Sequence, residues 1–153
     1  MYHDNDLTTG TSAVESNKQH LAEAPAMQGP QFAIEEKMAE SVRSGNYEAA
    51  YLFSDEGLPI AQSSSPAQQS IAPDQIAEMA ILFQDVRRMA SLMGGISRLR
   101  EVIIEGENRR KIVFRFFRAF DQQIILAVVV PPTTKAYRQR TNELEKLVLE
   151  VTS

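Results

Sequence analysis

The fold is decided by residues 98–130, which read RLREVIIEGENRRKIVFRFFRAFDQQIILAVVV. Runs of β-branched and aromatic residues alternate there with turn signals, one at Gly106-Glu107-Asn108 and another near Asp121. Strands that are joined by such short turns pair antiparallel. The pattern therefore predicts three successive antiparallel strands, over 98–105, 110–117 and 123–130.

The last of these strands, 123–130 (QIILAVVV), is apolar at nearly every position. A strand without a polar face has to be covered on both sides. We therefore expect it at the centre of the sheet, with helices on both faces. The strand over 98–105 carries charged residues on alternate faces, which suits an edge of the sheet.

Upstream, residues 47–53 and 58–62 predict a hairpin, with a loop at 54–57 (SDEG) whose glycine is free to take a positive φ. Proline has no backbone N–H to donate, so Pro59 places the second of these strands at the opposite edge of the sheet. Three aromatic residues of the first strand are expected to share one face: Tyr47, Tyr51 and Phe53.

Apolar residues at helical spacing predict three helices, over 31–44, 74–93 and 134–152. Asp74 is expected to cap the long helix, and Gly94-Gly95 to end it. The predicted fold class is an α/β (α+β) sandwich. It has a five-stranded, mainly antiparallel sheet, with the long helix on one face and the other two helices on the opposite face.

The long helix has more apolar surface than one sheet requires. Ile81 and Leu92 form a second ridge beside Glu78, Asp85 and Arg88. This ridge is either a partner surface or two stray apolar residues on a solvated face. The main apolar face is expected to lie on the sheet and consists of Ile76, Met79, Ala80, Phe83, Val86, Met89, Ala90 and Met93, with Leu82 at its margin.

An exposed edge strand directly after that helix favours a partner surface, because unpaired strand edges pair readily. A two-fold dimer that pairs 98–105 with itself would bring both long helices together. A register centred on Ile103 would place Glu101 opposite Glu105, whereas centres at Glu101 or Val102 avoid that repulsion. The predicted dimer interface comprises Ile81, Asp85, Arg88, Leu92, Arg98, Arg100, Val102 and Ile104.

Composition excludes several classes of function. The chain has 153 residues, a formal charge of -4 and a pI near 5.2, which argues against a general nucleic-acid binder. It has no cysteine, and therefore no disulfide, thiolate nucleophile or common structural zinc site. The longest apolar run, 124–132, is too short to cross a bilayer as a helix, and the first residues lack the features of a signal peptide. We expect a cytoplasmic protein without membrane insertion.

Residues 1–30 are polar, aperiodic and acidic, so we expect a disordered tail ahead of a single domain over 31–153. Both histidines, His3 and His20, fall in this tail. No catalytic, metal-binding or cofactor-binding constellation is visible, and we expect no enzyme and no cofactor. The basic residues near the strand ends indicate either an anion site or, as we expect, solvated side chains: Arg98, Arg100, Arg109, Arg110, Lys111, Arg115 and Arg118.

The order of elements resembles the Roadblock (dynein light chain) domain. The residues that carry the resemblance are 47–61 (YEAAYLFSDEGLPIA), 74–80 (DQIAEMA), 99–105 (LREVIIE) and 124–130 (IILAVVV). The resemblance implies homo- or heterodimers with a sheet that continues across the interface. It also implies scaffolds or regulators of small Ras-like GTPases, or motor light chains, and similar bacterial proteins act on a polarity GTPase as its activating partner. The family offers no catalytic triad to transfer.

The sequence thus predicts a non-catalytic homodimer that acts as a scaffold or regulator on a small Ras-like GTPase or a related signalling or motility complex. Two alternatives stay open. One is a small-molecule-sensing α/β domain, and the other is a structural assembly subunit.

Overall fold

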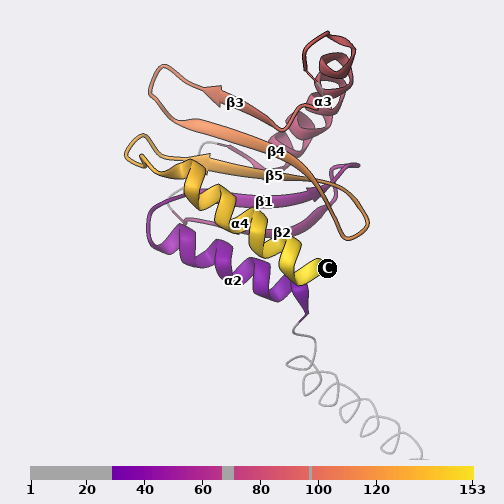
Figure 1. The fold of residues 1–153 in the computed structure, drawn as a ribbon. Coiled ribbons are helices and arrows are strands. Elements are labelled where there is room, and N and C mark those ends of the chain that lie inside the picture. Colours follow the sequence, from indigo (N-terminus) through magenta and orange to yellow (C-terminus); the bar gives the residue numbers. More distant parts are fainter. Residues whose placement is uncertain (1–28, 67–70, 97) are drawn as a thin grey trace, which may run out of the picture.

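The computed structural model describes residues 29–66, 71–96 and 98–153. The predicted tail, 1–30, lies outside the described residues except for its last two positions. The elements follow in the predicted order, with bounds shifted by a few residues (Figure 1): α2 (Pro30–Arg43), β1 (Ala49–Ser54), β2 (Pro59–Ser64), α3 (Pro73–Leu92), β3 (Glu101–Glu105), β4 (Lys111–Ala119), β5 (Gln122–Val130) and α4 (Tyr137–Thr152).

The five strands form one antiparallel sheet in the order β2-β1-β5-β4-β3. The predicted positions of three strands are confirmed. β5 is central, and its residues 124–130 are fully buried because both faces of the sheet are covered there. β2, which begins at Pro59, lies at one edge, and β3 lies at the other.

Each face of the sheet carries its own core. On one face, α2 and α4 pack side by side over residues such as Leu52, Leu126 and Val128. On the other face, α3 packs over Phe114, Ile125 and other residues of the opposite alternation. Figure 1 shows this arrangement of one helix against two, which confirms the predicted sandwich.

Two details of the prediction are wrong. Tyr47 does not share a face with Tyr51 and Phe53, but packs in the core beneath α2 and α4. It precedes β1, so the strand's alternation does not extend to it. Asp74 does not cap α3, because the helix begins at Pro73 with Ala72 as its N-cap. Its carboxylate lies in the first turn instead, where the helix dipole favours a negative charge.

The prediction for α3 is wrong along its second half. Ile76, Ala80 and Ala90 are buried as expected, but Val86 and Met89 are 40% and 66% exposed. The core beneath α3 takes helical residues only from the stretch that ends at Phe83. Beyond that stretch the helix rises away from the sheet (Figure 1), and its large apolar side chains stay exposed although the small Ala90 is buried.

Candidate interaction surface on α3 and β3

The second half of α3 presents a continuous apolar surface. Leu82, Val86, Met89 and Met93 follow one another at intervals of four, three and four residues, which places them on one side of a helix. We call these four residues the α3 stripe. Their exposed fractions are 60%, 40%, 66% and 60%, and Leu92 beside them is 86% exposed. A contiguous exposed apolar patch of this kind marks an interaction surface.

The two residues of the predicted ridge have different surroundings. Leu92 does not pack against the core of the domain. Ile81 is 45% exposed and packs against the hairpin between β1 and β2. A Cβ atom added to Gly57 of that hairpin would lie 2.7 Å from Ile81 Cδ1, and Gly57 has a φ of +84°. The positive φ therefore favours glycine in this hairpin, and an added Cβ would also require the Ile81 side chain to move.

β3 supplies an open edge next to this helix. The Phe116 N–H donates a hydrogen bond of 2.9 Å to Arg100 O, which fixes the phase of the β3–β4 ladder. By the alternation of an antiparallel pair, the backbone N–H and C=O groups of Glu101, Ile103 and Glu105 point away from β4. These groups are available to a further strand. Val102 and Ile104 pack partly against the core beneath α3.

β3 begins at Glu101, so Arg98 and Arg100 of the predicted edge strand precede it. The two carboxylates of β3 already have partners on β4. Glu101 lies 2.8 Å from Arg115 Nη2, and Glu105 lies 3.2 Å from Lys111 Nζ. These ion pairs reduce the repulsion expected for a register centred on Ile103, so charge alone does not choose among the three registers.

An apolar recess adjoins the α3 stripe. It measures about 590 Å³, and Leu82 of the stripe forms part of its wall. It lies between α3 and the start of β4, so a side chain of a docking partner could enter between helix and sheet. Its lining residues are Ile71, Gln75, Glu78, Met79, Leu82 and Ile112.

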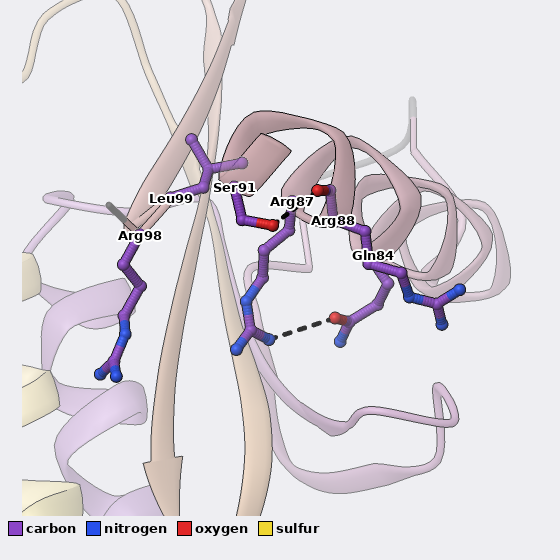
Figure 2. A pocket seen from close by; sticks show the side chains of 6 residues that line it. All are labelled: Gln84, Arg87, Arg88, Ser91, Arg98 and Leu99. Atoms are coloured by element: carbon purple, nitrogen blue, oxygen red, sulfur yellow. Dashed lines mark hydrogen bonds between the residues drawn. The ribbon is translucent and has the colours of Figure 1, made fainter. Parts of the chain in front are cut away.

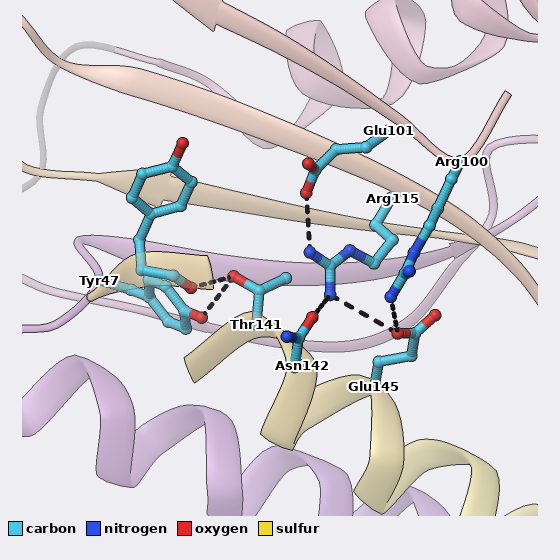
Figure 3. Close-up of polar contacts among 8 residues, drawn as sticks. Tyr47, Arg100, Glu101, Arg115, Thr141, Asn142 and Glu145 are labelled. Carbon is cyan, nitrogen blue, oxygen red and sulfur yellow. Dashed lines mark hydrogen bonds and ion pairs between the residues drawn. The ribbon is translucent and has the colours of Figure 1, made fainter. Parts of the chain in front are cut away.

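A buried ionic network ties β3 and β4 to α4 (Figure 3). The Arg115 side chain is 4% exposed and donates to Glu101 Oε1 at 2.8 Å and to Asn142 Oδ1 at 2.6 Å. Its Nη1 also lies 3.5 Å from Glu145, which pairs with Arg100 at 3.4 Å. Sequence reasoning missed this network, although an arginine on a buried strand facing Asn142 and Glu145, one helical turn apart, was a signal for it.

Other basic residues also have carboxylate partners. Arg110 pairs with Glu48, and Lys111 lies over the ring of Tyr137 as well as beside Glu105. The basic triplet at the β3–β4 hairpin is therefore largely neutralised within the chain. The sequence predicts a solvated side chain for Arg115, but this residue is buried.

Tyr47 extends the polar contacts of α4 into the core. Its hydroxyl lies 2.8 Å from Thr141 Oγ1, and both residues are almost fully buried. Burial raises the Tyr47 pKa to about 12. Thr141 Oγ1 donates its hydrogen to Tyr137 O at 2.6 Å, so the Tyr47 hydroxyl is the donor to Thr141 Oγ1. These contacts fix α4 on the sheet.

Within the described ranges, no three histidine, cysteine, aspartate or glutamate side chains lie close enough together to hold a metal ion. Nor does any helix in those ranges have the length and apolar character needed to span a bilayer. The geometry of the described part is that of a surface for association, built from the α3 stripe, the recess and the β3 edge.

No protein-family model matches the sequence, and no curated protein matches it either. Solved structures do match its fold. A structure of MglB with tetrameric arrangement has a TM-score of 0.66 at 17% identity, covering 80% of this chain and 90% of that one. The gliding protein MglB from Thermus thermophilus gives 0.63 at 15% identity, covering 80% and 90% of the two chains.

A Roadblock/LC7 domain from Streptomyces avermitilis gives a TM-score of 0.56 at 20% identity, covering 76% of this chain and 92% of that one. At such identities the likeness concerns the fold. The MglB structures and the Roadblock/LC7 domain match at least three quarters of this chain. The chain therefore has the fold of the Roadblock/LC7 domains that its sequence resembles.

Proposed function

We propose that this chain is a non-catalytic, cytoplasmic homodimer that serves as a scaffold or regulator of a small Ras-like GTPase or a related signalling or motility complex. The observation that carries the proposal is the exposed α3 stripe beside the open edge of β3. The stripe lies outside the chain's own cores, and its residue Leu82 shares a recess with Ile112, the β4 residue that pairs with Ile104 of β3. The fold and the resemblance supply the class of partner.

Self-association is supported by the kind of surface present. A strand edge can pair with its own copy about a two-fold axis, and the helix that adjoins the edge then meets its own copy as well. The proposed interface contains the α3 stripe and the residues named from the sequence that lie on α3 and β3, whereas Arg98 and Arg100 precede β3 and stand at the end of that interface. Burying the stripe in both copies would remove eight large apolar side chains from water, which is a substantial driving force.

The GTPase part of the proposal rests on the resemblance and on the comparisons. Three matching structures are of MglB, one of them described as a gliding protein. The paired sheet of a dimer would present a broad, continuous surface to a globular partner. Such a surface can hold or bias a GTPase without contributing a catalytic side chain of its own.

The direct test uses the full chain as bait in an extract of its own source organism, with GDP or a non-hydrolysable GTP analogue added. Capture of a small GTPase that depends on the nucleotide, followed by a changed rate of single-turnover GTP hydrolysis, is the expected result. A monomeric variant of this chain serves as the control. Capture of no GTPase, together with unchanged hydrolysis by candidate GTPases encoded nearby, would remove this function.

A small-molecule-sensing domain is the second candidate, and one observation favours it. A cleft lined by arginines opens at the end of α3, as described below. Filament formation on concentration, followed by light scattering, would instead favour a structural assembly subunit.

A further inference from the structure

A concave basic surface lies where the last turns of α3 meet the residues before β3 and the end of β4. Two adjoining cavities, of about 360 and 380 Å³, share Arg87, Arg98 and Leu99 in their walls. Arg118 lines the second cavity. We call this combined hollow the arginine cleft. Its size falls in the range of small-ligand sites, which span roughly 300–1,000 Å³.

Three of the five arginines that line the cleft have no carboxylate partner among the described residues, whereas Arg88 pairs with Asp85 and Arg100 with Glu145. Arg87 donates to the amide oxygen of Gln84 at 3.3 Å, and Arg118 donates to the backbone oxygen of Asp121 at 3.4 Å. Arg98 has no hydrogen bond or ion pair with any described residue. The carboxylate in the wall, Glu145, is already engaged by Arg100 and Arg115. This contrasts with Lys111 and Arg115 of β4, whose positive charges are paired with carboxylates.

The cleft is also partly preorganised. Figure 2 shows Arg87 and Arg98 extending in the same direction, while Arg88 turns away from them. The bond to Gln84 holds Arg87 in place. The amide nitrogen of Gln84 is buried and has no acceptor among the described residues, so its donor adds uncompensated partial positive charge to the wall.

The second cavity combines this charge with apolar surface. Leu99, Phe116 and Phe117 contribute to its lining, and Gln123 adds an amide. A site with guanidinium forks at one end and apolar walls at the other suits a ligand with anionic groups on an organic body. Guanidinium groups match phosphate oxygens in a bidentate geometry.

We propose that the arginine cleft binds a small molecule that carries at least two phosphate groups. Arg87 and Arg98 hold one group between them, Arg118 reaches the other, and Leu99 with Phe117 contacts the organic part. A lone surface arginine would be screened by solvent, but three arginines around one concave volume attract the same ligand. The proposal does not depend on the GTPase function, because binding of a phosphorylated molecule in the cleft requires no GTPase partner.

The test is calorimetric titration of the full chain with inorganic pyrophosphate at constant ionic strength. One pyrophosphate per chain is expected to bind, and Arg87→Gln and Arg98→Gln are each expected to weaken binding by roughly tenfold, the loss of one charge-assisted contact. Arg138→Gln is the matched control, because Arg138 is exposed on α4, outside the cleft. It is expected to bind like the wild type.

Three results would overturn the proposal. The first is no binding by the wild type, and the second is an equal loss in the Arg138→Gln control, which would mean non-specific attraction. The third is binding only in a monomeric variant, because the cleft would then be closed by a second copy. A glutamate-rich peptide is titrated in parallel, and its binding in place of pyrophosphate would assign the cleft to an acidic protein segment. Circular dichroism of each variant checks that it is folded.

Discussion

The two faces of the sheet are built from similar apolar residues, but the helices that pack on them are covered to different extents. On the face beneath α2 and α4, apolar side chains are covered and the one buried guanidinium among the described residues is matched by carboxylates. On the face beneath α3, the core stops at Phe83 and the helix continues with an uncovered apolar stripe. The difference is that the surface on one side is closed by the chain's own helices, while large apolar side chains on the other side stay exposed.

The largest effect should come from truncating matched leucines on the two sides. Leu144→Ala on α4 removes a side chain that is 1% exposed and should destabilise the fold by about 3 kcal/mol. Leu82→Ala on α3 removes one that is 60% exposed and should change the free energy of unfolding of the monomer by less than about 0.5 kcal/mol. Urea denaturation at low protein concentration measures both. Equal losses would mean that the α3 side is as closed as the other.

Charges placed on the exposed helix should break the proposed dimer. Ile81→Asp together with Leu92→Asp should give a folded monomer, but Ile81 also contacts the Gly57 hairpin. Met89→Asp with Leu92→Asp avoids that contact and is the sharper variant. We expect at least about hundredfold weaker association, which corresponds to about 2.7 kcal/mol. Multi-angle light scattering gives the mass, and a dimer that survives both double substitutions would place the interface elsewhere.

The buried network should matter more than an exposed ion pair on the same helix. Glu145→Ala leaves Arg115 with one carboxylate fewer in a buried site and should cost about 2 kcal/mol. Glu143→Ala removes the partner of Arg140, an exposed pair, and should cost less than about 0.5 kcal/mol. Thermal unfolding of both variants compares the two. A similar loss for each would show that the network adds nothing special to the closed face.

Tyr47 gives the smallest effect at neutral pH and a distinct pH dependence. Tyr47→Phe loses the contact with Thr141 and should cost about 1 kcal/mol. Because the folded-state pKa is raised from 10.0 to about 12, the unfolded chain releases this proton first as the pH rises, so stability falls between about pH 10 and 12. Denaturation across that range should show a shallower fall in Tyr47→Phe. Some slope should persist, since burial also raises the Tyr51 pKa.

The parts of this fold that could be predicted are those where the chemistry of a residue allows only one position in the sheet. Pro59 cannot pair in the interior of a sheet, so the position of β2 at an edge was predictable from the sequence. Residues 123–130 have no polar face to expose, so the central position of β5 was predictable as well. The exposed stripe was not predictable in the same way. Val86 and Met89 are apolar residues at the same helical spacing as Ile76. That spacing identifies the apolar face of the helix, but it does not indicate which part of that face another element covers.

The candidate site was predicted in outline and not in detail. A spare apolar surface on the long helix beside an edge strand follows from the residues, and both features are present. The role of Arg115 escaped prediction because its partners come from two other elements, β3 and α4, that lie far apart in sequence. The arginine cleft escaped for the same reason, since it joins Arg87 of α3 to Arg98 and Arg118 across two further segments.

The contact between Gly57 and Ile81 has a mechanical consequence. Ile81 lies near the middle of α3, so the hairpin supports the helix between its two ends. A larger residue at position 57 would push on the Ile81 side chain, and through it on the middle of α3. Gly57 therefore lets the hairpin and the helix approach each other closely.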